Sequence, residues 1–268
     1  MRDRQALKKA CRWLSALSIP DEDIESHILR LFALAVAGAS LVQIRACGAK
    51  LRHFDWQNYS GDPVPAIVAH LALTGLSVSH DSLALLEQAY RSVLLTSKEA
   101  AHLLCGLLAI PFTPNPAVHL PDAGRLVRSS REEVLAICRT ILLDTGAGSV
   151  PVEIYGAGFL PALTLSYARD WDLETCCALL RSCAYLNVSN AKEHQWAVDW
   201  LLDQQMSDGR FGLLHPEAMH GGVNADDWRS YFERTVYATW ALADTRGEVG
   251  INSFLSSSSH GPRFGPLR

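Results

Sequence analysis

The sequence predicts an all-α fold whose helices form two concentric layers. Apolar residues recur at helical spacing along most of the chain, and strand signals are almost absent. Some helical segments are apolar on nearly all sides, whereas others have one apolar face. Inner helices of a two-layer arrangement are buried all round, and outer helices show one face to water. A plain bundle or a superhelical repeat would give a similar pattern.

The helices of the first half follow from the spacing of apolar residues. Leu7, Cys11 and Leu14 lie on one face of a first helix. A second helix is expected over 21–44, where acidic residues suit the N-terminus and almost every side is apolar. Its apolar run is shorter than the roughly 20 residues of a membrane span, so we expect a buried helix and no integral membrane segment. Further helices are expected at 64–74, 79–95 and 97–110.

The second half continues with helices separated by turn residues. Segment 129–144 begins with a serine cap and carries Glu in its first turn. In segment 151–170, Pro161 is expected to kink a helix, and the glycines of "YGAGF" are interpreted as small residues that allow close helix packing. Further helices are expected at 172–186, 191–205 and 231–244. Residues 1–250 are predicted to form one domain, followed by a flexible, polar, Gly/Pro-rich tail at 251–268.

Composition excludes some classes of function. The net charge is −4 and no dense run of Lys and Arg occurs, which argues against a nucleic-acid partner because neutralising phosphates supplies most non-specific binding. Residues 1–20 lack the uninterrupted apolar stretch and cleavage site of a signal peptide. The seven cysteines are an odd number and lie mostly in apolar helical patterns, which is typical of reduced core thiols. We therefore expect a cytoplasmic protein.

One motif is unusual for a helix end. In "WAVDWLLDQQMSDGRFG", residues 196–212, the spaced members are Trp200, Gln205, Gly209 and Phe211. Gln205 could satisfy backbone groups at a helix end, and Gly209 could adopt a left-handed turn. The spacing resembles the glutamine and tryptophan repeat of triterpene cyclases, and more broadly the turns of terpenoid cyclases and protein prenyltransferases. It is also similar to the turn of small bacterial toroid-like proteins of uncharacterised function.

The resemblance covers one unit, residues 196–244, and implies an (α/α) toroid or partial toroid. It implies that the glutamine of an outer helix bonds to the backbone at the end of a neighbouring helix. It also implies a central hydrophobic pocket for an isoprenoid or a modified peptide in natural-product biosynthesis. The candidate substrate-binding aromatics are Trp56, Tyr59, Tyr155, Phe159, Tyr231, Tyr237 and Trp240. Each of them could instead be an ordinary core residue.

The known catalytic motifs of the resembled families are missing. Neither the DxDD motif nor the metal-binding DDxxD motif of terpene cyclases occurs, and no Asp, Cys and His cluster suggests the prenyltransferase zinc site. If the protein is an enzyme, acid–base chemistry would fall to Glu153, Asp170, His215, His220 or Asp226. We predict no cofactor and no metal at the His215 and His220 pair. The alternative is a non-catalytic binding or scaffold protein with the same fold, and a protein partner stays open.

Overall fold

The computed structural model describes residues 2–52, 54, 59, 61–74, 120–148, 155–212 and 227–246. Over these ranges every regular element is a helix, so the all-α prediction is confirmed for them. The α-helices are α1 (Arg2–Ala16), α2 (Ile24–Val36), α3 (Leu41–Cys47), α4 (Pro63–Thr74), α7 (Ala123–Leu126), α8 (Arg131–Asp144), α9 (Leu160–Arg169), α10 (Leu173–Tyr185), α11 (Lys192–Asp203) and α13 (Arg229–Arg246). Short 3-10 turns, η1 (Ala49–Leu51) and η3 (Ala157–Phe159), complete the set.

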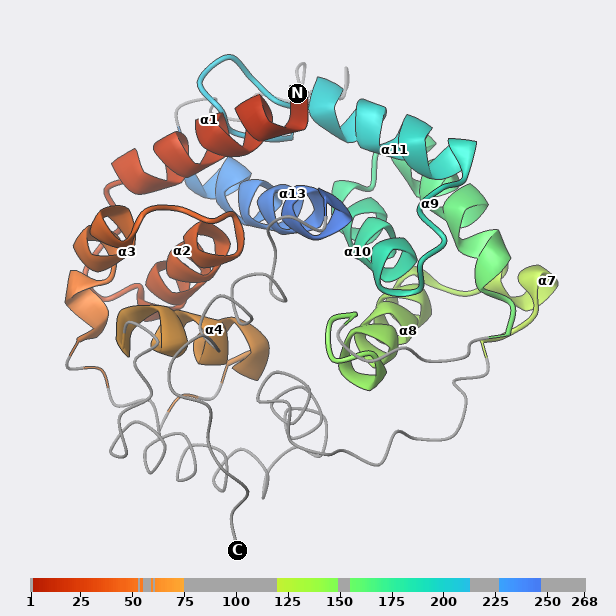
Figure 1. The fold of residues 1–268 in the computed structure, drawn as a ribbon, viewed down its shortest axis with the longest axis horizontal. Coiled ribbons are helices and arrows are strands. Elements are labelled where there is room, and N and C mark those ends of the chain that lie inside the picture. Colours follow the sequence, from red (N-terminus) through yellow and green to blue (C-terminus); the bar gives the residue numbers. More distant parts are fainter. Residues whose placement is uncertain are drawn as a thin grey trace, which may run out of the picture.

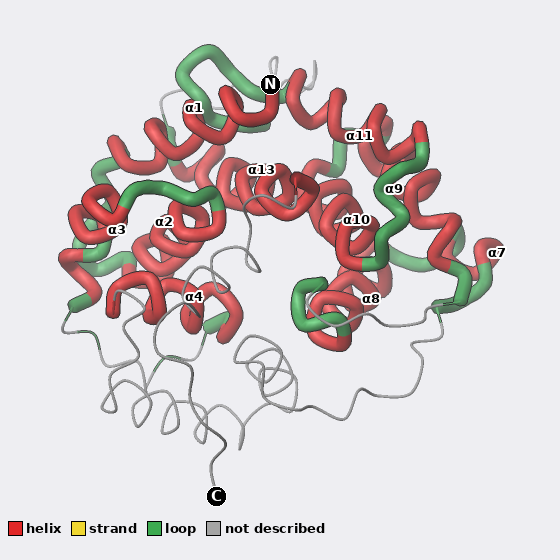
Figure 2. Tube along the Cα trace, in the orientation of Figure 1, coloured by secondary structure: helices red, strands yellow, loops and turns green. Residues whose placement is uncertain are grey.

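The described helices lie in two curved rows (Figure 1). Helices α3, α1, α11 and α9 form the outer row, and α4, α2, α13, α10 and α8 form the inner row (Figure 2). Packing follows the rows: α2 contacts α1, α3 and α4, and α10 contacts α8, α9 and α11. Burial agrees with this arrangement, because α2 and α10 are buried on nearly all sides whereas α1 and α11 bury one face.

The first helices of the chain, α1 and α2, pack against the last described helices, α11 and α13. Helix α13 packs on both α2 and α10, and α11 contacts α1. The turn after α11 joins them: Gln205 Nε2 donates to the carbonyl oxygens of Ala6 in α1 (2.8 Å) and of Gly209 (3.0 Å). The backbone N–H of the fully buried Phe211 donates to Thr235 Oγ1 in α13 (2.9 Å). The expected bond from Gln205 to the backbone of a neighbouring helix is present, but its acceptor, Ala6, lies inside α1 and is not one of the unpaired carbonyls at a helix end.

Gly209 allows this turn to approach α1 closely. Its φ is +108°, a backbone conformation that residues other than glycine rarely adopt. A Cβ at this position would lie 2.3 Å from the carbonyl oxygen of Lys9. Because that oxygen belongs to the backbone of α1, it cannot rotate away. Glycine is thus required both by the left-handed backbone and by the contact between the turn and α1.

The expected helix over 21–44 is wrong, because it is interrupted by a turn. Helix α2 ends at Val36, and Gly38 adopts a φ of +71°. The N–H groups of Gly38 and Ala39 donate to the carbonyls of Ala35 and Leu34, which is the Schellman arrangement. Helix α3 then starts with a capping box between Ser40 and Gln43. The apolar composition of this turn conceals the break in the sequence.

The expectation for segment 151–170 also needs correction. Pro161 lies in the first turn of α9, where its missing N–H costs nothing, so it starts the helix and does not kink it. Gly156 has a φ of +90°, and a Cβ on Gly158 would meet no atom within 4 Å. These glycines therefore serve the turn before α9 and not close helix packing. By contrast, the serine cap of α8 is confirmed, since Ser130 and Glu133 form a reciprocal capping box.

Two further features of the described residues bear on function. All six cysteines in the described ranges are free and buried, in agreement with their predicted place in the core. Within the same ranges, no helix combines the length and the apolar composition that crossing a membrane requires.

Candidate functional site

A pocket of about 280 Å³ opens on the inner row, between α8, α10 and α13. We call it the inner pocket. Its lining combines apolar, aromatic and charged side chains, the usual composition of a small-molecule site. The described lining residues are Asp62, Leu135, Ala136, Cys138, Arg139, Leu142, Glu174, Ala178, Arg181, Tyr185, Tyr237 and Trp240.

An arginine and a tryptophan define one side of the inner pocket. The guanidinium carbon of Arg181 lies 3.4 Å from the ring centre of Trp240, close enough for a cation–π interaction. Trp240 is 6% exposed and packs edge-to-face on Phe32 of α2, with ring centres 4.7 Å apart. In the described part of the chain, the buried Nη1 of Arg181 has no hydrogen-bond partner. A buried donor without a partner is uncommon in proteins, and this one belongs to a residue that lines the pocket.

The carboxylates at the opening of the inner pocket form ion pairs with arginines. Asp62, just before α4, forms an ion pair with Arg139 of α8 at 3.2 Å. Glu174 of α10 pairs with Arg131, which also bonds to Asp172 at 2.9 Å. These pairs are partly exposed, so each contributes little to stability. They do fix the orientation of the charged side chains around the opening.

The lining thiol and the two lining phenols are protonated at neutral pH. Burial raises the pKa of the Cys138 thiol to about 11, far from the low value of a reactive thiolate. Burial, together with the nearby carboxylate of Glu174, raises the pKa of Tyr237 to about 12. Tyr185 donates to the carboxylate of Asp244, and burial raises its pKa well above the ordinary value. None of these groups is a nucleophile or a general base in this state.

Two of the predicted substrate-binding aromatics, Tyr237 and Trp240, line the inner pocket. Tyr231, nearer the start of α13, is buried but does not line the pocket. The guanidinium carbon of Arg210 lies 4.3 Å from the centre of its ring. Phe159 is half-buried at the start of α9, and Tyr155 is 64% exposed. The structure therefore brings together only part of the predicted set.

The other predicted residues fall in different places. Tyr59 is half-buried and contacts Phe54, with ring centres 6.1 Å apart. Asp170 is exposed at the C-terminal end of α9. Trp56, Glu153, His215, His220 and Asp226 lie outside the described residues. Among the described residues, no group of three or more His, Cys, Asp or Glu could hold a metal ion.

Sequence reasoning missed the polar half of the inner pocket. Arg181 is the one charged residue in "TCCALLRSCAYL" (175–186), and a lone cation in a buried helix is a signal that could have been used. Asp62 precedes Pro63 and accepts from the N–H of Val64 at 3.0 Å, so in the sequence it looks like an ordinary helix cap.

The geometry of the inner pocket suits a ligand with apolar surface and an acceptor group that reaches Arg181. Comparisons of the chain with protein-family models, with curated proteins and with solved structures found no match.

Proposed function

We propose that the two rows of helices form an (α/α) toroid, of the kind found in terpenoid cyclases and protein prenyltransferases. Outer and inner helices alternate along the chain from α1 to α4 and again from α9 to α13, which supports this arrangement (Figure 2). The bond from Gln205 to Ala6 supports it further, since it ties an outer helix near the C-terminus to the first outer helix. The inner pocket then faces the axis of the toroid.

We propose that the protein binds a small, largely apolar ligand in the inner pocket as part of natural-product metabolism in the cytoplasm. The observation that carries this proposal is the stacking of Arg181 on Trp240 among apolar neighbours. The indole offers a flat apolar surface, and Arg181 offers a donor beside it. An isoprenoid or a modified peptide combines apolar surface with a few polar atoms, so either class fits.

The described lining residues offer a ligand site but no evident general base. Cys138 and Tyr237 stay protonated at neutral pH, and Glu174 is held by Arg131. Acid–base chemistry would have to come from the predicted candidates outside the described residues, such as His215 or Asp226. An enzyme that cyclises or modifies the ligand is the first candidate, and a non-catalytic binding protein is the second, favoured by the protonated thiol and phenols. Both candidates share the same ligand site.

The proposal is tested by filling the pocket with a side chain. Ala136 is exposed on α8 and lines the inner pocket, so Ala136→Phe fills it without disturbing the core. Ala162→Phe, at an exposed position of α9 outside the lining, is the matched control. Calorimetric titrations would use farnesol and a cyclic dipeptide of leucine and phenylalanine.

We expect one of these probes to bind saturably to the wild type and to Ala162→Phe. Its affinity for Ala136→Phe should fall at least about tenfold, which corresponds to about 1.4 kcal/mol of lost binding free energy. The proposal is wrong if neither probe binds, or if both variants bind as the wild type does.

A further inference from the structure

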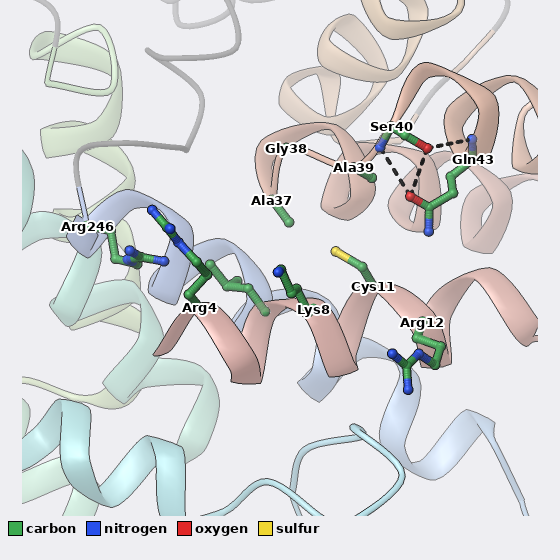
Figure 3. A pocket seen from close by; sticks show the side chains of 11 residues that line it. Arg4, Lys8, Cys11, Arg12, Ala37, Gly38, Ala39, Ser40, Gln43 and Arg246 are labelled. Atoms are coloured by element: carbon green, nitrogen blue, oxygen red, sulfur yellow. Dashed lines mark hydrogen bonds between the residues drawn. The ribbon is translucent and has the colours of Figure 1, made fainter. Parts of the chain in front are cut away.

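A second, larger depression shares no lining residue with the inner pocket. It has a volume of about 650 Å³ and is bounded by α1, by the turn between α2 and α3, and by the end of α13 (Figure 3). We call it the basic cleft. Its described lining residues are Arg4, Leu7, Lys8, Cys11, Arg12, Ala37, Gly38, Ala39, Ser40, Gln43 and Arg246.

The charge of the basic cleft has one sign. Arg4, Lys8 and Arg12 follow one another at intervals of one helical turn, so they form a row along one face of α1. Arg246, at the end of α13, adds a fourth cation from a different helix. None of the described lining residues is acidic. Four cations thus line one depression in a chain whose net charge is −4, and one of them, Arg246, also lies 3.9 Å from the carboxylate of Asp3.

Some exposed cations of the described residues are matched with carboxylates. Arg2 pairs with Asp203, and Lys50 pairs with Asp21 at 2.6 Å. In the described part of the chain, neither Lys8 nor Arg12 has a carboxylate within ion-pair distance, and the same holds for Arg45 and Lys192 outside the cleft. Like charges four residues apart on a helix repel each other, so this row is unfavourable for the protein alone. A bound anion would relieve the repulsion.

The opposite wall of the cleft offers space and a donor. Ala37, Gly38 and Ala39 carry little or no side chain. The N–H groups of Gly38 and Ala39 already donate to the last carbonyls of α2, so those carbonyls are engaged within the turn. Gln43 accepts two hydrogen bonds from Ser40 through its Oε1 atom, which leaves its Nε2 amide group to donate.

We propose that the basic cleft binds a phosphate-bearing ligand with at least two negative charges, such as a diphosphate group. Three of the four cations are arginines, whose planar guanidinium groups match phosphate oxygens in pairs. The volume is in the range of small-molecule sites. A free phosphorylated molecule and a phosphorylated lipid headgroup share this chemistry. The basic cleft shares no lining residue with the inner pocket, so this proposal does not depend on the function proposed there.

The first test is calorimetric titration of the full chain with inorganic diphosphate at low ionic strength. The double variant Lys8→Gln/Arg12→Gln removes two cations from the row. Lys192→Gln/Arg45→Gln removes the same charge from exposed positions outside the cleft and is the matched control. We expect the Kd to rise at least about twentyfold in the first variant and less than about twofold in the control. Added salt should weaken the binding.

Folding is monitored in parallel. Because the substitutions remove repulsion on α1, the melting temperature of Lys8→Gln/Arg12→Gln should equal or exceed that of the wild type. A second arm measures sedimentation with phosphatidylcholine vesicles, with and without a phosphoinositide. Binding to phosphoinositide vesicles that Lys8→Gln/Arg12→Gln loses identifies a lipid headgroup as the source, and binding to diphosphate alone identifies a soluble ligand. Either result supports the phosphate site.

Three results would overturn the proposal. The first is the absence of saturable binding to both diphosphate and phosphoinositide vesicles. The second is an equal loss of affinity in the two double variants, which would mean that net charge alone governs binding. The third is equally tight binding of a polyglutamate peptide, which would show that the cleft has no preference for phosphate.

Discussion

The replacement Gly209→Ala probes the turn that follows α11 and contacts the first outer helix, α1. At a φ of +108°, a residue with a side chain costs about 1–3 kcal/mol of backbone strain. The new Cβ would also lie 2.3 Å from the carbonyl oxygen and 2.5 Å from the carbonyl carbon of Lys9, so the turn must move away from α1. That movement breaks the bond from Gln205 to Ala6, which contributes about 1 kcal/mol.

The expected loss in the free energy of unfolding is therefore about 2–4 kcal/mol. For a chain of this size it corresponds to a decrease in melting temperature of roughly 5–15 °C. Thermal unfolding followed by circular dichroism measures it. Gly158→Ala is the control, since its Cβ would meet open space, and it should unfold within about 1 °C of the wild type. Equal melting temperatures for Gly209→Ala and Gly158→Ala would refute the proposed role of the turn.

Three other predictions concern buried polar groups. Burial lowers the pKa of His194 to about 4, so stability should be complete above about pH 6.5 and fall as the pH decreases toward 4, by up to about 3 kcal/mol in urea unfolding. His194→Phe should remove this dependence. Arg30→Met should cost about 2–4 kcal/mol in the same assay, because the carbonyls of Leu17 and Cys47 lose their buried donor. Cys138, with a pKa of about 11, should react with iodoacetamide only after unfolding, as peptide mass spectrometry would show.

Each of these three has a clear contrary outcome. An unchanged pH dependence in His194→Phe would mean that another group causes the acid sensitivity. Full stability of Arg30→Met would show that water replaces the guanidinium at both carbonyls. Rapid labelling of Cys138 at pH 7 in the folded protein would contradict the raised pKa and reopen thiol chemistry in the inner pocket.

Local sequence signals predicted the helices well and their interruptions poorly. The capping box of Ser130 and Glu133 can be read from the sequence because both partners lie within one turn. The break at Gly38 could not be read with the same ease, because its neighbours are small and apolar and continue the helical pattern. Pro161 was ambiguous for a related reason, since the same residue either starts or kinks a helix depending on where the preceding turn lies.

The candidate sites were predictable only in part. Tyr237 and Trp240 lie on one predicted helix, so helical spacing could predict that both side chains line the same pocket. Asp62 and Glu174 enter the same pocket from helices far apart in the chain, and each has a sufficient local explanation near a helix N-terminus. The convergence of Arg246 with the row on α1 likewise depends on the tertiary fold. Long-range proximity of this kind leaves no trace in local spacing.

The most direct measurement of ligand binding at the inner pocket is mass spectrometry of small molecules released from the purified protein. Wild type, Ala136→Phe and Ala162→Phe would be produced in the same native host and denatured in organic solvent. We predict one apolar compound, an isoprenoid or a modified peptide, in the wild type and in Ala162→Phe and its absence from Ala136→Phe. Recovery of the same compound in equal amount from all three proteins would contradict binding at the pocket beside Arg181 and Trp240.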